Sequence, residues 1–224
     1  MITKELKNKI FNKFSIMDER NHTLLSAFVV CKKKKTLYLH IAKTGGSSID
    51  HLLTINRLND GFLDDPDISF EDKKSYFQEV VENWDQYYKF TFIRNKYHQL
   101  VSNYEYDKPY TLKNCTFEEF IRKHVAAKSS KDSELYPNYN YWIDQYFITT
   151  CDDTPIFDFV GNHKTYKQDL QKVCKDIGIE YQEVKKNLGT YNRKRKYSDY
   201  YNQELKDIVG SMFPEEIKHF KWQL

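Results

Sequence analysis

The chain has 224 residues, a formal net charge of +3 and a pI of about 8.4. This length suits one sizeable domain, and so mild a positive charge does not indicate a nucleic-acid partner. The four cysteines stand far apart without a C-x-x-C pair, which argues against zinc and against a disulfide framework and favours a reducing compartment. We therefore expect a single domain over residues 1–224, with a polar lead-in at residues 1–23 and no metal.

No segment predicts a membrane anchor. The N-terminal stretch MITKELKNKIFNKF carries charges throughout and lacks the apolar region of a signal peptide. The longest apolar run, from Leu24 to Cys31, is far too short to span a bilayer. These features predict a cytoplasmic protein.

Hydrophobic periodicity predicts strands that alternate with helices. In chain order we expect a short helix around residues 6–14, strands at 24–31 and 36–41, a helix from 49, a helix over 70–84, a strand at 89–93, helices from 96 and from 117, a strand at 156–160, a helix over 164–177 and a last helix over 201–212 that ends near Pro214. Asn95 has the properties of an N-cap, Thr116 and Glu119 form a capping-box pattern, and Gly178 is typical of a helix end. This order predicts an α/β fold with a largely parallel sheet.

The most informative stretch runs from Thr36 to Thr54. A predicted strand is followed by a turn at residues 42–48 and then by a helical apolar stripe. Strand, glycine-rich turn and helix N-terminus form a geometry that binds phosphate, because glycines let the backbone approach and the helix offers unpaired N–H groups. Lys43 adds a charge beside Gly45 and Gly46. Thr44, Ser47 and Ser48 add hydroxyl donors.

The order of these residues distinguishes two kinds of phosphate loop. The P-loop of NTPases, G-x-x-x-x-G-K-[ST], has its lysine after the last glycine, whereas Lys43 comes before Gly45 and Gly46. The segment instead resembles the 5′-phosphosulfate loop of sulfotransferases, P-K-T-G-G-T-S, in their carbohydrate branch, with Ala42 in place of proline. This resemblance implies a three-layer, P-loop-like fold with a central, largely parallel sheet flanked by helices. The alternative is a glycine-containing turn that binds no ligand.

A second phosphate motif lies between Lys89 and Tyr106. Arg94 ends a predicted strand and Ser102 lies in the following helix, and an arginine with a hydroxyl can hold a doubly charged phosphate. The stretch resembles the sulfotransferase pattern F-x-F-x-R-N-P-Y-x-R-x-x-S-x-Y, which holds the 3′-phosphate of PAPS (3′-phosphoadenylyl sulfate). Lys96 replaces the proline of that pattern, and Gln99 replaces its second arginine. The alternative is that Arg94 makes only a structural ion pair.

Weaker similarity extends over residues 36–210. The segment from Phe157 to Cys174 resembles the family's D-F-I-G-R-F-E-N-L region, and His163 falls near the position that flanks adenine in relatives. Gln145 matches a glutamine often seen in the carbohydrate branch. The basic run from Asn187 to Tyr197 resembles a late loop that closes over PAPS, which implies cofactor contacts by Arg193 and Lys194.

The resemblance implies transfer of a sulfuryl group to a hydroxyl, with Lys43 stabilising the leaving phosphate. A general base should remove the acceptor proton. The histidine that does so in much of this branch aligns with Ser69, which cannot serve. We favour Glu71 and then Asp67, although each acid is individually better explained as a solvated or helix-start carboxylate. The remaining candidates are Asp64, Asp65, Asp72 and His51. An acid from this interval could reach the sulfuryl group if the loop over residues 56–69 folds across the mouth of the cleft.

The leading hypothesis is a PAPS-dependent sulfotransferase that acts on a glycan or another small-molecule hydroxyl and releases PAP, the desulfated cofactor. One alternative is a non-catalytic module that binds PAP or polyanions through residues 32–35 and 193–196. Another is a kinase-like P-loop enzyme, against which the absence of G-K-[ST] argues.

Overall fold

The computed structural model describes residues 2–15, 24–110, 112–125, 144–183 and 195–224. The chain forms two compact units. The sheet unit comprises residues 1–93 and 149–186, and the helical unit comprises residues 94–148 and 187–224.

A four-stranded sheet in the order β1-β2-β3-β6 is the centre of the sheet unit. Its strands are β1 (Phe28–Cys31), β2 (Thr36–Leu39), β3 (Tyr88–Ile93) and β6 (Phe159–Asn162). The strand β1 is antiparallel to β2, whereas β2, β3 and β6 are parallel. The predicted, largely parallel sheet is therefore confirmed. Because β2 and β3 are parallel, their carboxyl ends lie at the same edge of the sheet.

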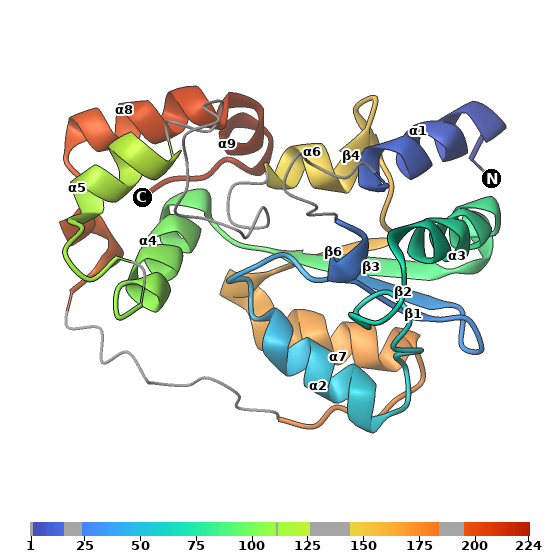
Figure 1. Ribbon diagram of the computed structural model, residues 1–224. Helices are drawn as coiled ribbons and strands as arrows, with labels where there is room; N and C mark the ends of the chain where they lie inside the picture. The colour runs from blue at the N-terminus through green and yellow to red at the C-terminus, as the bar shows by residue number, and fades with distance from the viewer. Residues whose placement is uncertain (1, 16–23, 111, 126–143, 184–194) are drawn as a thin grey trace. The chain divides into compact units, whose positions relative to one another are not determined.

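Helices cover both faces of this sheet (Figure 1). The helices α1 (Lys4–Phe14) and α3 (Phe70–Glu82) lie on one face, and α2 (Gly46–Ile55) and α7 (Tyr166–Asp176) lie on the other. Successive strand residues point to opposite faces. Phe28 packs against Phe77 of α3, while Tyr38 and Phe90 stack within the core beneath α2 and α7. The result is the three-layer arrangement expected from the sequence.

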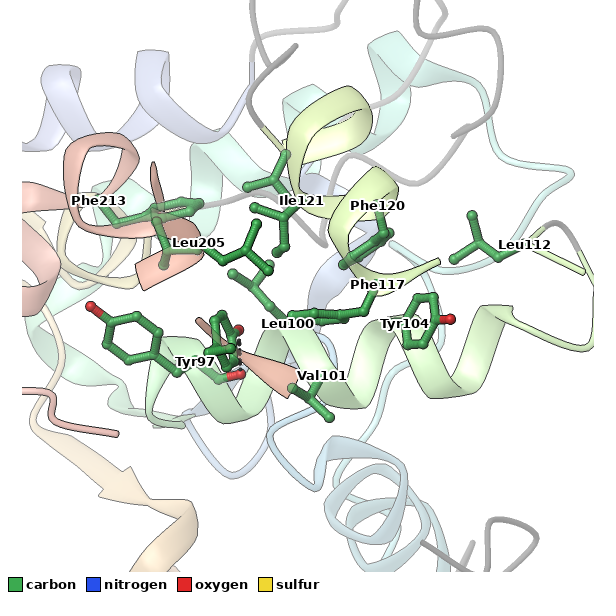
Figure 2. Close-up of a cluster of buried hydrophobic side chains, with 13 residues drawn as sticks. Tyr97, Leu100, Val101, Tyr104, Leu112, Phe117, Phe120, Ile121, Leu205 and Phe213 are labelled. Carbon is green, nitrogen blue, oxygen red and sulfur yellow. Dashed lines mark hydrogen bonds between the residues drawn. The ribbon is translucent and has the colours of Figure 1, made fainter. Parts of the chain in front are cut away.

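The helical unit has an aromatic core of its own (Figure 2). It contains α4 (Lys96–Asp107), α5 (Phe117–Glu119) with the π-helical segment Phe120–Val125, α8 (Gln203–Met212) and α9 (Pro214–Phe220), together with the start of α6 (Gln145–Thr149). Both predicted caps are present: the Asn95 side chain accepts a hydrogen bond from the backbone N–H of Tyr97, and Thr116 with Glu119 forms the capping box.

Three predicted strands are shifted or shortened. The strand β2 ends at Leu39, two residues earlier than predicted. A 3₁₀ turn, Leu25–Ala27, occupies the first part of the predicted strand 24–31, so β1 begins at Phe28. The strand predicted at 156–160 lies at Phe159–Asn162, because Ile156 and Phe157 pack against Trp84 instead. Buried apolar residues just before a strand are hard to separate from the strand by periodicity alone.

A two-stranded hairpin and the helices α6 and α9 were not predicted. The hairpin, β4 (Thr150–Cys151) with β5 (Thr154–Pro155), turns through Asp152 and Asp153, which both have positive φ. The predicted helix end near Pro214 is confirmed, since α8 ends at Met212, but α8 is not the last helix, because α9 begins at Pro214. Proline suits the first helical position, where its missing N–H would have no partner in any case.

Candidate functional site

The first phosphate motif forms a tight turn between β2 and α2. Lys43 has a φ of 64° and Gly45 a φ of 101°, so both lie in the left-handed region that L-residues disfavour. The helix α2 starts at Gly46, and no side chain of the described residues caps its N-terminus. Lys35 and Lys221 also have positive φ, so this conformation does not by itself mark a binding site. The uncapped helix start beside Lys43 can bind an anion.

The surroundings of the turn require both glycines. A Cβ atom on Gly45 would lie 2.6 Å from Cε2 of Tyr166, and one on Gly46 would enter the His40 ring. The Tyr166 hydroxyl also donates a hydrogen bond of 3.1 Å to the Gly45 carbonyl oxygen. Burial raises the pKa of Tyr166 to about 12, so this hydroxyl stays protonated and able to donate at neutral pH.

The three hydroxyl residues of the motif differ in their surroundings. Ser47 is exposed, as expected of a ligand-binding residue, whereas Ser48 is buried and hydrogen-bonds to the Tyr166 side chain. Thr44 departs from the expectation, because its hydroxyl is fully buried and donates to the Ile41 carbonyl oxygen at 2.7 Å. The Thr44 hydroxyl thus stabilises the turn instead of pointing to a ligand.

A histidine–aspartate pair beside the turn was missed. His40 Nδ1 lies 2.7 Å from Oδ2 of Asp50 in α2, and the His40 ring lies against Gly46. The pair connects the residue after β2 to the helix that the turn leads into. In the sequence, the pair consists of a histidine just before the turn and an aspartate near the start of the following helix. This spacing alone does not predict that the two side chains meet.

The acidic interval that contains the predicted base lies partly away from Lys43. Asp60 accepts hydrogen bonds from the Lys32 backbone N–H and the Tyr76 hydroxyl, and Phe62 stacks on Tyr76. Lys32 follows the last residue of β1, which pairs with the first residue of β2. Lys43 follows the carboxyl end of β2, so the two lysines lie at opposite ends of these strands. This part of the loop therefore does not cross the phosphate turn, contrary to the arrangement considered from the sequence.

The two preferred acids are exposed in the structure. Glu71 lies in the first turn of α3, behind the N-cap Ser69, and Asp67 lies in the preceding loop. A carboxylate at a helix start interacts favourably with the helix dipole, which accounts for Glu71 without a catalytic role. No described contact joins Glu71 or Asp67 to the phosphate turn, so their assignment as base stays a prediction.

Arg94, the residue after β3, belongs to the helical unit and is buried there. Its Nη2 atom donates to the Tyr197 hydroxyl at 2.5 Å, and its guanidinium carbon lies 5.7 Å from the centre of the Tyr197 ring. Tyr197 stacks on His98 with ring centres 3.9 Å apart. Ser102 is half-buried one helical turn beyond His98, so these two residues share a face of α4.

The other predicted contacts are spread over the chain. His163 is half-buried, with its ring centre 6.1 Å from that of Tyr166. Arg193 and Lys194 lie outside the described residues. Lys32, which was considered for polyanion binding, instead pairs with Glu79 at 2.5 Å and lies over the Tyr76 ring.

Among the described residues, no three His, Cys, Asp or Glu side chains are grouped so that they could hold a metal ion. The same part of the chain contains no helix that is long and apolar enough to cross a membrane.

Comparisons with known proteins identify one family. A model of the sulfotransferase family matches residues 26–221, which include both phosphate motifs. A protein of Archaeoglobus fulgidus described as uncharacterized is 30% identical over 115 residues, which are 50% of this chain and 87% of that protein. No solved structure matches the chain.

Proposed function

Because the chain belongs to the sulfotransferase family, we propose that it transfers the sulfuryl group of PAPS to a hydroxyl of a carbohydrate. The observation that carries this proposal is the turn before α2, where Lys43 is held in a left-handed conformation beside an uncapped helix start. Such a turn offers a cation and backbone N–H donors to a phosphate. It fits the 5′-phosphosulfate end of the donor.

In the proposed reaction PAPS supplies an activated sulfuryl group, whose bond to the bridging phosphate oxygen breaks while a bond to the acceptor oxygen forms. Lys43, the backbone N–H groups of the turn and Ser47 hold the 5′ end and stabilise the charge on the leaving phosphate. Arg94 and Ser102 hold the 3′-phosphate, and His163 contacts the adenine. Arg193 and Lys194, in the basic run over residues 187–197, provide further contacts to PAPS.

A base must take the acceptor proton, and Glu71 remains our first choice and Asp67 our second. A general base contributes typically about 10²–10⁴-fold to the rate. We predict that Glu71→Gln lowers turnover at least about a hundredfold while PAP affinity changes by no more than a few-fold. If Glu71→Gln keeps full turnover and Asp67→Asn does not, the base is Asp67. If neither change matters, the base lies elsewhere.

The test of the proposed function is transfer of labelled sulfate from PAPS to a library of glycans and small alcohols. We expect a labelled product with a sugar acceptor, formed at least about a hundredfold more slowly by the Lys43→Ala variant that serves as control. PAP binding without transfer to any acceptor would instead support the non-catalytic binding module.

A further inference from the structure

One side chain holds the main chain of Arg94 on both sides. The Arg94 backbone N–H donates to Oε1 of Gln145 at 2.8 Å, and Nε2 of Gln145 donates to the Arg94 carbonyl oxygen at 2.8 Å. The amide of Gln145 thus pairs with the Arg94 peptide groups as a neighbouring strand would. Gln145 is fully buried, so water does not compete for these hydrogen bonds.

The Gln145 amide is itself fixed by Glu216 of α9. Oε2 of Glu216 accepts from the Gln145 backbone N–H at 2.6 Å, and Oε1 accepts from Gln145 Nε2. The two Nε2 hydrogens therefore have two acceptors, Glu216 and the Arg94 carbonyl. A flipped amide would set Oε1 against both of these oxygens, so only one orientation satisfies the core.

Glu216 pairs in turn with Lys96, one of the two residues that depart from the family pattern. Lys96 Nζ lies 3.1 Å from Oε2 of Glu216 and donates to Oε1 of Gln99 at 2.8 Å. Lys96, Gln99 and Glu216 all have no exposed surface. Burial raises the pKa of Glu216, while the charge of Lys96 and the Gln145 N–H groups act in the opposite direction. Of the two departures, Lys96 therefore pairs with the buried carboxylate, and Gln99 accepts a hydrogen bond from Lys96.

We infer that Gln145 and Glu216 are positioning residues for the donor's 3′-phosphate, because they set the main chain from which the Arg94 side chain extends. The inference rests on the proposed role of Arg94 in binding that phosphate. Tyr197 holds the guanidinium end of Arg94 and Gln145 holds its backbone, so the side chain is fixed at both ends. Fixing a binding group before the ligand arrives lowers the cost of binding.

The experiment compares the affinities of PAP and AMP by calorimetry, because the two ligands differ in the 3′-phosphate. The wild-type protein should bind PAP at least about tenfold more tightly than AMP, and Arg94→Ala should remove most of that gap. Gln145→Met keeps the length of the side chain without its hydrogen bonds. It should lower the PAP:AMP ratio at least about threefold while AMP affinity changes little.

The matched control is Tyr201→Phe, which removes a buried hydrogen bond of 2.9 Å to the Tyr97 carbonyl in the same unit (Figure 2, dashed). This variant should be destabilised but keep the wild-type PAP:AMP ratio, as a purely structural loss would. Equal wild-type affinities for PAP and AMP would refute the role of Arg94 itself. A wild-type protein that discriminates, together with a folded Gln145→Met variant of unchanged ratio, would refute only the positioning role.

Gln145→Asn provides a second variant, since its shorter amide keeps polar groups in the core but cannot reach both Arg94 and Glu216. It should also lower the ratio. If neither Gln145 variant folds, the network is a requirement of folding and the positioning inference is overturned.

Discussion

The left-handed backbone at Lys43 is unfavourable for the stability of the protein, although the Lys43 side chain has a proposed role in the reaction. An L-residue in that region costs roughly 1–2 kcal/mol relative to glycine, and Lys43 has a φ of 64°. The ammonium group that we propose to act on the leaving phosphate is therefore placed at the expense of some stability, as is common at functional sites.

We predict that Lys43→Ala and Lys43→Gly both lower turnover on the order of 10²–10³-fold, since each removes the charge that stabilises the leaving group. Lys43→Gly should also be more stable than Lys43→Ala by about 1 kcal/mol, because glycine adopts this φ without strain. Turnover with PAPS and denaturant unfolding measure the two effects. Equal stability of the two variants would show that the turn is relaxed.

The contact between His40 and Gly46 gives a second test at this scale. In an open helix, glycine to alanine is stabilising, but here the new methyl group would meet the His40 ring. We predict that Gly46→Ala destabilises the protein by about 1–3 kcal/mol through overpacking. In the double variant with His40→Ala, the cost of the Gly46 change should largely disappear, as a double-mutant cycle would show. Additive changes would mean that the ring does not limit this position.

At the scale of the element, α4 shows how a buried charge can replace a motif residue. Lys96 occupies the first helical position, where the family pattern has proline and where proline is intrinsically favourable. Its ammonium group instead pairs with Glu216 and lies 4.3 Å from the centre of the Phe213 ring, at the start of α9. The local preference for proline is thus overridden by a partner on another helix.

We predict that Lys96→Pro, although it restores the family pattern, destabilises the protein by roughly 3–5 kcal/mol, because it leaves the Glu216 carboxylate buried without its cation. Lys96→Pro combined with Glu216→Gln should recover much of that loss, since a neutral amide needs no counter-charge. Denaturant unfolding of the two variants measures the difference. A mildly destabilised Lys96→Pro variant would indicate that Glu216 is neutral in the native protein.

At the scale of the whole molecule, Glu216 should make stability depend on pH. Burial raises its pKa above the ordinary value of 4.5, so the native state holds this proton more tightly than the unfolded state does. The free energy of unfolding therefore contains a favourable contribution below that value. This contribution is lost as the pH rises from 4.5 through the raised pKa.

We predict that Glu216→Gln removes this part of the pH dependence. Unfolding free energies of the wild-type protein and the variant, measured across a pH series, should differ by an amount that changes in the window above pH 4.5. A difference that stays constant across the series would show that Lys96 and Gln145 cancel the effect of burial.

The sequence alone determined the architecture and the phosphate turn, because both depend on patterns among residues that are close together in the sequence. Alternation identified the strands β2 and β3, and the residues that follow each strand carried the two motifs. The caps at Asn95 and Thr116 were also predictable, because a cap involves residues only a few positions apart.

Only the tertiary structure decided how those motif residues are held. Gln145 lies 51 positions from Arg94 and 71 from Glu216 in the sequence, yet the three form one buried network. No pattern among neighbouring residues predicts such contacts, because the free energy of a buried polar group depends on what surrounds it after folding. The same reason hid the pairing of His40 with Asp50, and it turned the Thr44 hydroxyl from an expected ligand donor into a support for the turn.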